Sequence, residues 1–205
     1  MGIIHHLTRK PWLPEQREID NLTTGGAISL PTPKVGLRVF LFPISALFVL
    51  FFIAYVMRMR FADWQTLHDP MVLWLNTGVL ILSSLALQRA RVSARQGNMP
   101  ATRASLVVGG VFAFAFLGGQ LVAWQQLAAL GYFADTNPAN AFFYLFTALH
   151  GLHLLGGLVA WGRTVLKIGR GAETDHVCLS TELCAVYWHY LLAVWAAMFS
   201  LLLAT

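Results

Sequence analysis

The sequence predicts an all-α membrane protein, built as a bundle of five transmembrane helices. Of its 205 residues, 57% are hydrophobic and only 11% are charged, and the mean hydropathy is +0.62. Soluble domains rarely have this balance. The apolar residues fall into five stretches, each long enough for a helix that rises about 1.5 Å per residue to cross a hydrocarbon core of about 30 Å. Short polar segments separate the stretches and would join neighbouring helices.

A polar segment precedes the first apolar stretch. Residues 1–34 mix charged side chains with Gly25, Gly26 and three prolines, and they contain no apolar run like that of a secretory signal. We interpret them as a cytoplasmic arm that lies on a partner or on the membrane surface. Residues 35–205 would then form the transmembrane domain.

The predicted spans are residues 35–57, 70–88, 104–127, 140–161 and 182–204. In the first span Pro43 should bend the helix, and Arg58 and Arg60 close it with side chains that can reach the lipid headgroups. The second span carries polar groups that can bond to neighbouring helices or to their own backbone. These groups are Asn76, Thr77, Ser83 and Ser84.

The third span has small residues at every fourth position, namely Ala115, Gly119 and Ala123. This small-xxx-small pattern lets two helix backbones approach closely. We therefore expect another helix to pack against this side of the third span.

The fourth span carries two histidines in an otherwise apolar stretch. At about 100° per residue, Thr147, His150, His153 and Gly157 fall within an arc of about 120°. Polar rings inside a membrane span are costly and usually face protein or water. This polar, small-residue face should therefore point into the bundle.

Positive charge lies mainly on one side of the predicted membrane. Eleven of the 14 Lys and Arg residues lie in the arm, in the connection between the second and third spans, or in that between the fourth and fifth. The opposite side has only Arg58 and Arg60. The positive-inside rule then predicts a cytoplasmic N-terminus and a periplasmic C-terminus. The basic pI of about 9.6 follows from this topology, so we expect no nucleic-acid partner.

Three interpretations compete for the histidines. Metal or haem ligation needs further ligands at the same depth, and the sequence offers only His189 in the fifth span, with Glu182 two turns before it on the same face. Proton or ion transport uses acidic or histidine chains through the bilayer, but all nine acidic residues fall in the arm, in loops or near the inner surface. Hydrogen bonding between helices by His150, His153 and His189 is the interpretation we favour.

The fifth span also holds aromatic residues and one of the two cysteines. The run Tyr187-Trp188-His189-Tyr190, followed by Trp195, could line a cofactor, but aromatic residues in a span more often pack or anchor it at the interface. Cys178 and Cys184 lie six positions apart and match no zinc-binding spacing. We interpret the aromatic run as packing and the cysteines as free thiols.

These motifs together resemble the cytochrome c oxidase subunit III family of the haem-copper oxidases. The resemblance covers about residues 34–204, and the five spans are similar to the short bacterial form of the family. Its strongest part is Thr147-x-x-His150-x-x-His153-x-x-x-Gly157, followed by the aromatic run and Trp195. Supporting motifs, in chain order, are Lys34-Val35-Gly36, Leu75-Asn76-Thr77, Ser83-Ser84, Gly119-Gln120 and Phe142-Phe143-Tyr144.

The resemblance implies a non-catalytic subunit of a bacterial inner-membrane terminal oxidase that reduces O2 to water and translocates protons. In that family, haem and copper are bound by subunits I and II, and subunit III packs against the catalytic subunit and holds phospholipid. We therefore expect this chain to bind no redox cofactor and no metal, and to meet cytochrome c or quinol only through the complex. A structural, interhelical role is expected for Thr147, His150, His153, His189, Gln120 and Glu182.

The chain departs from the family pattern at three acidic positions. Many members have an acid where this chain has Ala46 and Leu192. In the third span an acid often precedes the aromatic residue in the family, whereas this chain has Gln120-x-x-Ala123-Trp124. No role of those acids can be transferred to this chain. We interpret it as a divergent branch with a reduced protonic role.

Two alternatives remain open from the sequence. One is the related accessory subunit of a nitric oxide reductase, which shares these motifs. The other is an independent membrane transporter, which the absence of an acid at mid-membrane depth makes the weaker of the two.

Overall fold

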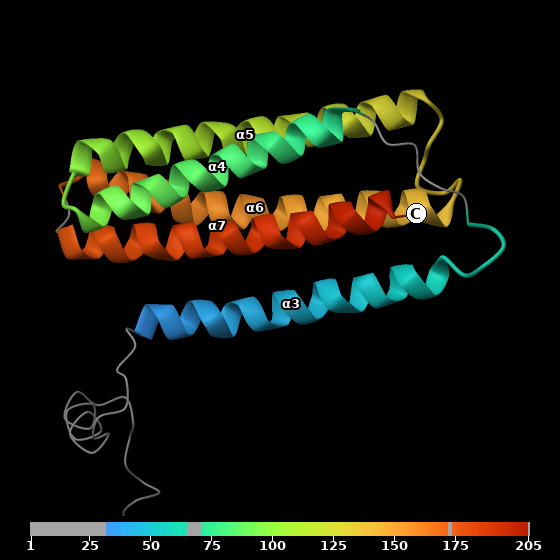
Figure 1. Ribbon diagram of the computed structural model, residues 1–205, viewed down its shortest axis with the longest axis horizontal. Coiled ribbons are helices and arrows are strands. Elements are labelled where there is room, and N and C mark those ends of the chain that lie inside the picture. The colour runs from blue at the N-terminus through green and yellow to red at the C-terminus, as the bar shows by residue number, and fades with distance from the viewer. Residues whose placement is uncertain (1–31, 65–70, 172–173, 205) are drawn as a thin grey trace, which may run out of the picture. The chain divides into compact units, whose positions relative to one another are not determined.

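The chain folds into long α-helices joined by short connections (Figure 1). The computed structural model describes residues 32–64, 71–171 and 174–204. Within these ranges lie α3 (Thr32–Arg58), α4 (Met71–Arg95), α5 (Met99–Ala129), α6 (Pro138–Gly169) and α7 (Thr174–Leu203). All five are long and apolar enough to cross a membrane. The prediction of an all-α fold with five candidate transmembrane helices is confirmed.

The helices extend beyond the predicted spans. The helix α6 continues to Gly169, whereas the predicted span ends at residue 161, and α7 begins at Thr174 rather than at residue 182. Hydropathy marks only the part of a helix that lies in hydrocarbon, while backbone hydrogen bonding carries the helix on through the interface. Of the predicted arm, residues 1–31 lie outside the described residues, and Thr32 to Lys34 belong to α3.

Local sequence signals set the starts of α5 and α6. The side chain of Asn98 accepts a hydrogen bond from the backbone N–H of Ala101 at 3.1 Å, and that of Asn137 accepts one from Ala139 at 3.2 Å. These caps satisfy donors that the first helical turn leaves unpaired. Pro138 follows at the first position of α6, where a proline costs no hydrogen bond.

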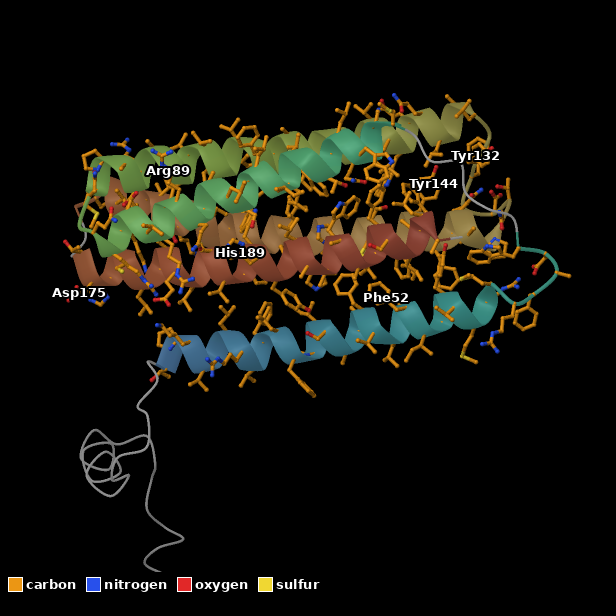
Figure 2. The ribbon with its side chains drawn as sticks, in the orientation of Figure 1. Phe52, Arg89, Tyr132, Tyr144, Asp175 and His189 are labelled. Carbon is orange, nitrogen blue, oxygen red and sulfur yellow. The ribbon has the colours of Figure 1, made fainter. Side chains whose placement is uncertain are left out.

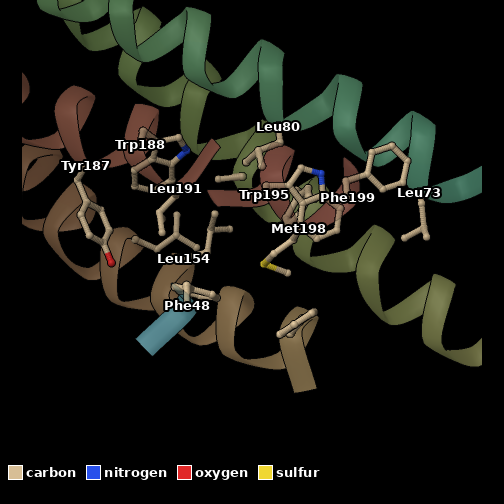
Figure 3. Packing of buried hydrophobic residues seen from close by; sticks show 14 of the residues in the cluster. Phe48, Leu73, Leu80, Leu154, Tyr187, Trp188, Leu191, Trp195, Met198 and Phe199 are labelled. Carbon is tan, nitrogen blue, oxygen red and sulfur yellow. The ribbon is translucent and has the colours of Figure 1, made fainter. Parts of the chain in front are cut away.

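The helices α4 to α7 pack side by side around a core of large side chains (Figures 1 and 3). Figure 3 shows Leu73 and Leu80 of α4 against Trp195 and Phe199 of α7. All four are buried, and Trp195 and Phe199 stack with ring centroids 6.2 Å apart. Because lipid is as apolar as these residues, close packing rather than escape from water holds the helices together.

The helix α3 meets α6 and α7 through aromatic side chains. Tyr55 of α3 is fully buried against Phe142 and Phe146 of α6, with ring centroids 5.4 and 5.7 Å away. Phe52 also contacts the ring of Phe146, at 5.8 Å (Figure 2). With α7, the ring of Phe40 lies 6.3 Å from that of Tyr187, and the hydroxyl groups of Ser45 and Tyr190 are hydrogen-bonded at 2.9 Å. Between α4, α5, α6 and α7 the Cα atoms of neighbouring helices come within 8 Å, whereas α3 meets α6 and α7 through side chains.

The turn after α3 is held by an ion pair. Arg58 donates to both carboxylate oxygens of Asp63, one of them at 2.7 Å. This hydrogen bond holds the pKa of the Asp63 carboxyl below its ordinary value. The pair is exposed to solvent, so it orients the connection more than it stabilises the fold.

Candidate functional site

The polar side chains of the spans lie where helices meet, and the first such place is the contact between α4 and α7. His189 of α7 is labelled in Figure 2. Its Nδ1 lies 2.5 Å from the hydroxyl of Ser84, and its Nε2 lies 3.1 Å from Oε1 of Gln88. His189 and Gln88 are half-buried, and Ser84 is buried. Both nitrogens of this imidazole therefore bond to α4, and the ring joins two helices that lie about a hundred residues apart in sequence.

Charged side chains lie at one end of the contact between α4 and α7. The carboxylate of Glu182 accepts hydrogen bonds from Arg91 and from Arg95, both at 3.0 Å. The Glu182 side chain is 14% exposed, and those of Arg91 and Arg95 are 23% and 54% exposed. One carboxylate of α7 thus bonds to two guanidinium groups of α4 and compensates one of their two positive charges.

Two buried tryptophans of α7 bond to hydroxyl groups of α4. Trp188 donates to Ser83 at 3.0 Å, and Ser83 donates to the backbone carbonyl of Gly109 on α5 at 2.8 Å. Trp195 donates to Thr77 at 2.9 Å. Thr77 in turn donates to the carbonyl of Leu73 on its own helix at 2.8 Å. The prediction that the hydroxyls of the second span bond to neighbouring helices or to their own backbone is confirmed. The tryptophan donors were missed, although a buried indole N–H generally has an acceptor.

A similar bond joins α5 to α6. The indole of Trp124 donates to the hydroxyl of Thr147 at 3.0 Å, and this hydroxyl donates to the carbonyl of Phe143 at 2.7 Å. Farther along the same contact, Trp161 donates to the carbonyl of Leu106 at 2.8 Å. These bonds hold the two antiparallel helices in register.

The two histidines of α6 have different surroundings. His150 is fully buried, and neither ring nitrogen has a hydrogen-bond partner among the described residues. Its ring packs against Phe116 of α5 and Trp195 of α7, at 5.8 and 5.3 Å between centroids. His153 is half-buried; its Nδ1 lies 2.7 Å from the carbonyl of Leu149 on the same helix.

His153 faces α3 and α7. Its ring lies 5.5 Å from that of Phe48 on α3, and its backbone carbonyl accepts a hydrogen bond from the hydroxyl of Tyr187 at 3.0 Å.

Gln120 of α5 is 5% exposed, and both polar atoms of its carboxamide lack partners among the described residues.

Small residues mark the closest approaches between helices. A methyl group added at Gly119 would lie 2.8 Å from Cγ of Asn76 on α4, and one added at Gly157 would lie 2.8 Å from the ring of Tyr187 on α7. Ala123 is buried on the same side of α5 as Gly119, while Ala115 is exposed. The close contact of α5 with α4 therefore includes Gly119 but not Ala115.

A cleft of about 400 Å³ opens between α3, α6 and α7. Its walls are mainly apolar and include Leu37 and Phe40 of α3. Arg163 and Lys167 of α6 supply its two cations, and Lys167 donates to the hydroxyl of Ser180 at 3.1 Å. The cleft thus combines an apolar interior with positive charge at one end.

These groups suit structural linkage between helices. Within the described residues, no three His, Cys, Asp or Glu side chains gather where they could hold a metal ion. Cys178 and Cys184 are free thiols, as predicted. Most of the polar groups described above bond from one helix to the next.

Comparisons with known proteins identify related sequences. Residues 32–203 match the family model described as cytochrome c oxidase subunit III. The probable cytochrome c oxidase subunit 3 of Mycobacterium tuberculosis H37Rv is 29% identical over 126 residues, which are 62% of this chain and 62% of that protein. Cytochrome c oxidase subunit 3 of Thermostichus vulcanus is 28% identical over 173 residues, 82% of this chain and 85% of that protein. The match thus spans about three fifths of the length of the mycobacterial relatives.

Proposed function

This chain belongs to the cytochrome c oxidase subunit III family, and we propose that it is a non-catalytic subunit of a bacterial aerobic terminal oxidase. In this proposal it stabilises the catalytic subunit of a complex that reduces O2 to water and translocates protons. Haem and copper would be bound by subunits I and II, and cytochrome c or quinol would donate electrons to those subunits. The observation that carries the proposal is the family match over residues 32–203, which includes all five described helices.

The polar links support a structural role. His189, Glu182 and Thr147 each connect two helices through side-chain hydrogen bonds. Such bonds fix how neighbouring spans rotate and slide relative to each other. We therefore assign these residues to the architecture of the subunit rather than to electron or proton transfer.

The half-buried pair of Gln88 and His189 supports contact with a partner subunit. Both side chains lie within hydrophobic helices and remain partly exposed on the isolated chain. A polar group facing hydrocarbon is costly, whereas a neighbouring protein helix can offer hydrogen bonds. We place a helix of another oxidase subunit over this part of the contact between α4 and α7.

The distribution of charge supports the proposed orientation. Figure 2 shows Arg89 and Asp175 at one end of the bundle, and Tyr132 and Tyr144 at the other. In Figure 1, α4 and α6 end and α5 begins at this first end. These segments carry Arg89, Arg91, Arg95, Arg103, Arg163 and Lys167. By the positive-inside rule this end faces the cytoplasm, so the C-terminus would lie in the periplasm of a bacterial inner membrane.

Purification in mild detergent through a tag on this chain tests the proposed function. We expect a haem-bearing large subunit to co-purify, with copper and haem in its metal content and O2 reduction in the preparation. Non-haem iron in place of copper would instead identify the accessory subunit of a nitric oxide reductase. A stable isolated chain that binds its own haem, or that carries ion flux in liposomes, would contradict the proposal.

We also propose that the cleft between α3, α6 and α7 holds a phospholipid. An acyl chain suits its apolar walls, and Arg163 and Lys167 would bind the phosphate. In the proposed orientation both cations lie toward the cytoplasmic end of α6, so we expect them at the depth of lipid headgroups.

Removal of both cations should lower the amount of lipid bound. We expect the double variant Arg163→Gln/Lys167→Gln to retain markedly less anionic phospholipid per complex, as measured by quantitative lipid mass spectrometry after delipidating washes. The matched control is Arg89→Gln/Arg170→Gln, which removes two exposed cations outside the cleft. Equal loss of lipid in both variants would show that the cleft is not the binding site.

A further inference from the structure

Two polar side chains in the middle of the bundle lack hydrogen-bond partners among the described residues. They are His150 of α6, with no exposed surface, and Gln120 of α5, which is 5% exposed. Almost all buried polar groups in proteins bond to protein or to ordered water. Leaving one unpaired costs about 1–3 kcal/mol. The unpaired ring nitrogens of His150 and the unpaired carboxamide atoms of Gln120 therefore indicate that a small molecule is bound between them.

Neighbouring contacts place the two side chains at the same level. Trp124 of α5 bonds to Thr147 of α6, and a methyl group added at Gly151 of α6 would lie 3.8 Å from Leu117 of α5. Because α5 and α6 run antiparallel, these two contacts mark the ends of residues 117–124 on α5 and of residues 147–151 on α6. Gln120 lies inside the segment on α5, and His150 lies inside the segment on α6.

Both side chains also lie on the inner side of the bundle. Gln120 is one helical turn from Phe116, whose ring contacts that of His150 at 5.8 Å. Trp195 of α7 packs on both rings, 5.0 Å from Phe116 and 5.3 Å from His150. The indole N–H of Trp195 already donates to Thr77. The rings of Phe116 and Trp195 therefore flank the imidazole of His150 and offer it no hydrogen-bond partner.

We infer that Gln120 and His150 bind an ordered water molecule between α5 and α6. A neutral imidazole offers one donor and one acceptor, and a carboxamide offers donors and an acceptor. A water molecule can donate to one of these groups and accept from the other. Polar groups that face each other beyond direct hydrogen-bond distance are commonly joined in this way.

Other ligands suit the site less well. A metal ion would need further ligands, and no metal-binding cluster of three or more His, Cys, Asp or Glu exists in the part of the chain that the structure describes. An ionic ligand would be buried without an opposite charge, which is strongly unfavourable. A neutral water needs no such compensation. The inference goes beyond the proposed function, because it holds whichever catalytic subunit the chain accompanies.

The water would complete the contact between α5 and α6. Trp124 and Trp161 already link these helices on either side of this level. Through the water, Gln120 and His150 would link them between those two bonds. The prediction that His150 helps to join helices would then hold by way of a bound molecule.

A cryo-electron-microscopy map of the purified complex, at a resolution that shows ordered water, tests the inference directly. We expect a density peak within hydrogen-bond distance of both the Gln120 carboxamide and one ring nitrogen of His150. A direct contact between carboxamide and imidazole, with no peak, would overturn the inference. A peak as strong as that of a metal ion would also overturn it. The map needs no variant, so the outcome does not depend on whether a substituted chain folds.

Infrared difference spectra supply a second readout. We expect an O–H stretching band of a buried water that shifts when the solvent is exchanged for water labelled with oxygen-18. The band should be lost in Gln120→Met, because methionine has a similar size but lacks the hydrogen-bonding groups of the carboxamide. The matched control is Gln126→Met, because Gln126 is an exposed glutamine on the same helix. The control should keep the band. A band that persists in Gln120→Met would contradict the assignment.

Discussion

Replacing Gly119 by alanine should destabilise the bundle by about 2–4 kcal/mol, because the added methyl group would displace Asn76. This group would lie 2.8 Å from Cγ of Asn76, which is buried on α4. The amide of Asn76 donates to the carbonyl of Phe116 at 3.0 Å, so its displacement also breaks a bond between α4 and α5. Unfolding in a mixed-micelle titration with a denaturing detergent measures the free-energy change.

The neighbouring glycine provides a matched control. A methyl group added at Gly118 meets no atom within 4 Å. Gly118→Ala should therefore leave stability unchanged or raise it slightly, since alanine favours the helix over glycine by up to about 1 kcal/mol. Similar stability of the two variants would show that α4 and α5 do not approach closely at Gly119.

Glu182→Gln should destabilise the subunit by about 1–3 kcal/mol, because two guanidinium groups would lose the carboxylate between them. Removing one partner of a buried ion pair costs about 3–5 kcal/mol, and an exposed pair contributes at most about 1 kcal/mol. Glu182 and Arg91 lie between these limits, with side chains 14% and 23% exposed. The expected readouts are a lower melting temperature of the subunit and a lower yield of assembled complex.

Asp175→Asn is the control for the loss of one negative charge. Asp175 is exposed in the first turn of the same helix, so this change should cost at most the helix-dipole contribution of about 0.3–1 kcal/mol and lower the melting temperature less than Glu182→Gln does. If both variants behaved alike, net charge rather than the contact with Arg91 and Arg95 would explain the effect. A salt titration adds a further check, since screening weakens exposed pairs more than partly buried ones.

The five helices were predictable because their signal is compositional. A long apolar stretch has few alternatives to a membrane-spanning helix, since every backbone group must be bonded within the segment. The ends of the helices were less predictable. The cap at Asn137 lies close to the predicted start of the fourth span, but α7 begins eight residues before its predicted span, in a segment too polar to be counted as part of an apolar stretch.

The helical arc of the fourth span predicted an inward face but not the partner of each residue on it. His150 and His153 lie about 60° apart around α6, which is enough to turn them toward different helices. His150 packs against α5 and α7, whereas His153 lies against Phe48 of α3. A periodicity within one helix carries no information on which helix lies beside it.

The bond between His189 and α4 could not be derived from the sequence for the same reason. Its partners Ser84 and Gln88 belong to a helix 101 to 105 residues away. Their pairing depends on the rotation of both helices about their axes, which the packing of the whole bundle determines. The hydroxyls of α4 were nevertheless recognisable as bonding groups, because they lie within an apolar span.

The aromatic contact of α3 has a consequence for the order in which the bundle assembles. Among the described helices α3 leaves the ribosome first, since synthesis proceeds from the N-terminus. Membrane helices form individually and associate afterwards, and close backbone approach strengthens their association. Because α4, α5, α6 and α7 approach closely, whereas α3 is held by side chains such as Phe48, Tyr55 and Ser45, we expect α3 to dock after the other described helices, although it is synthesised before them.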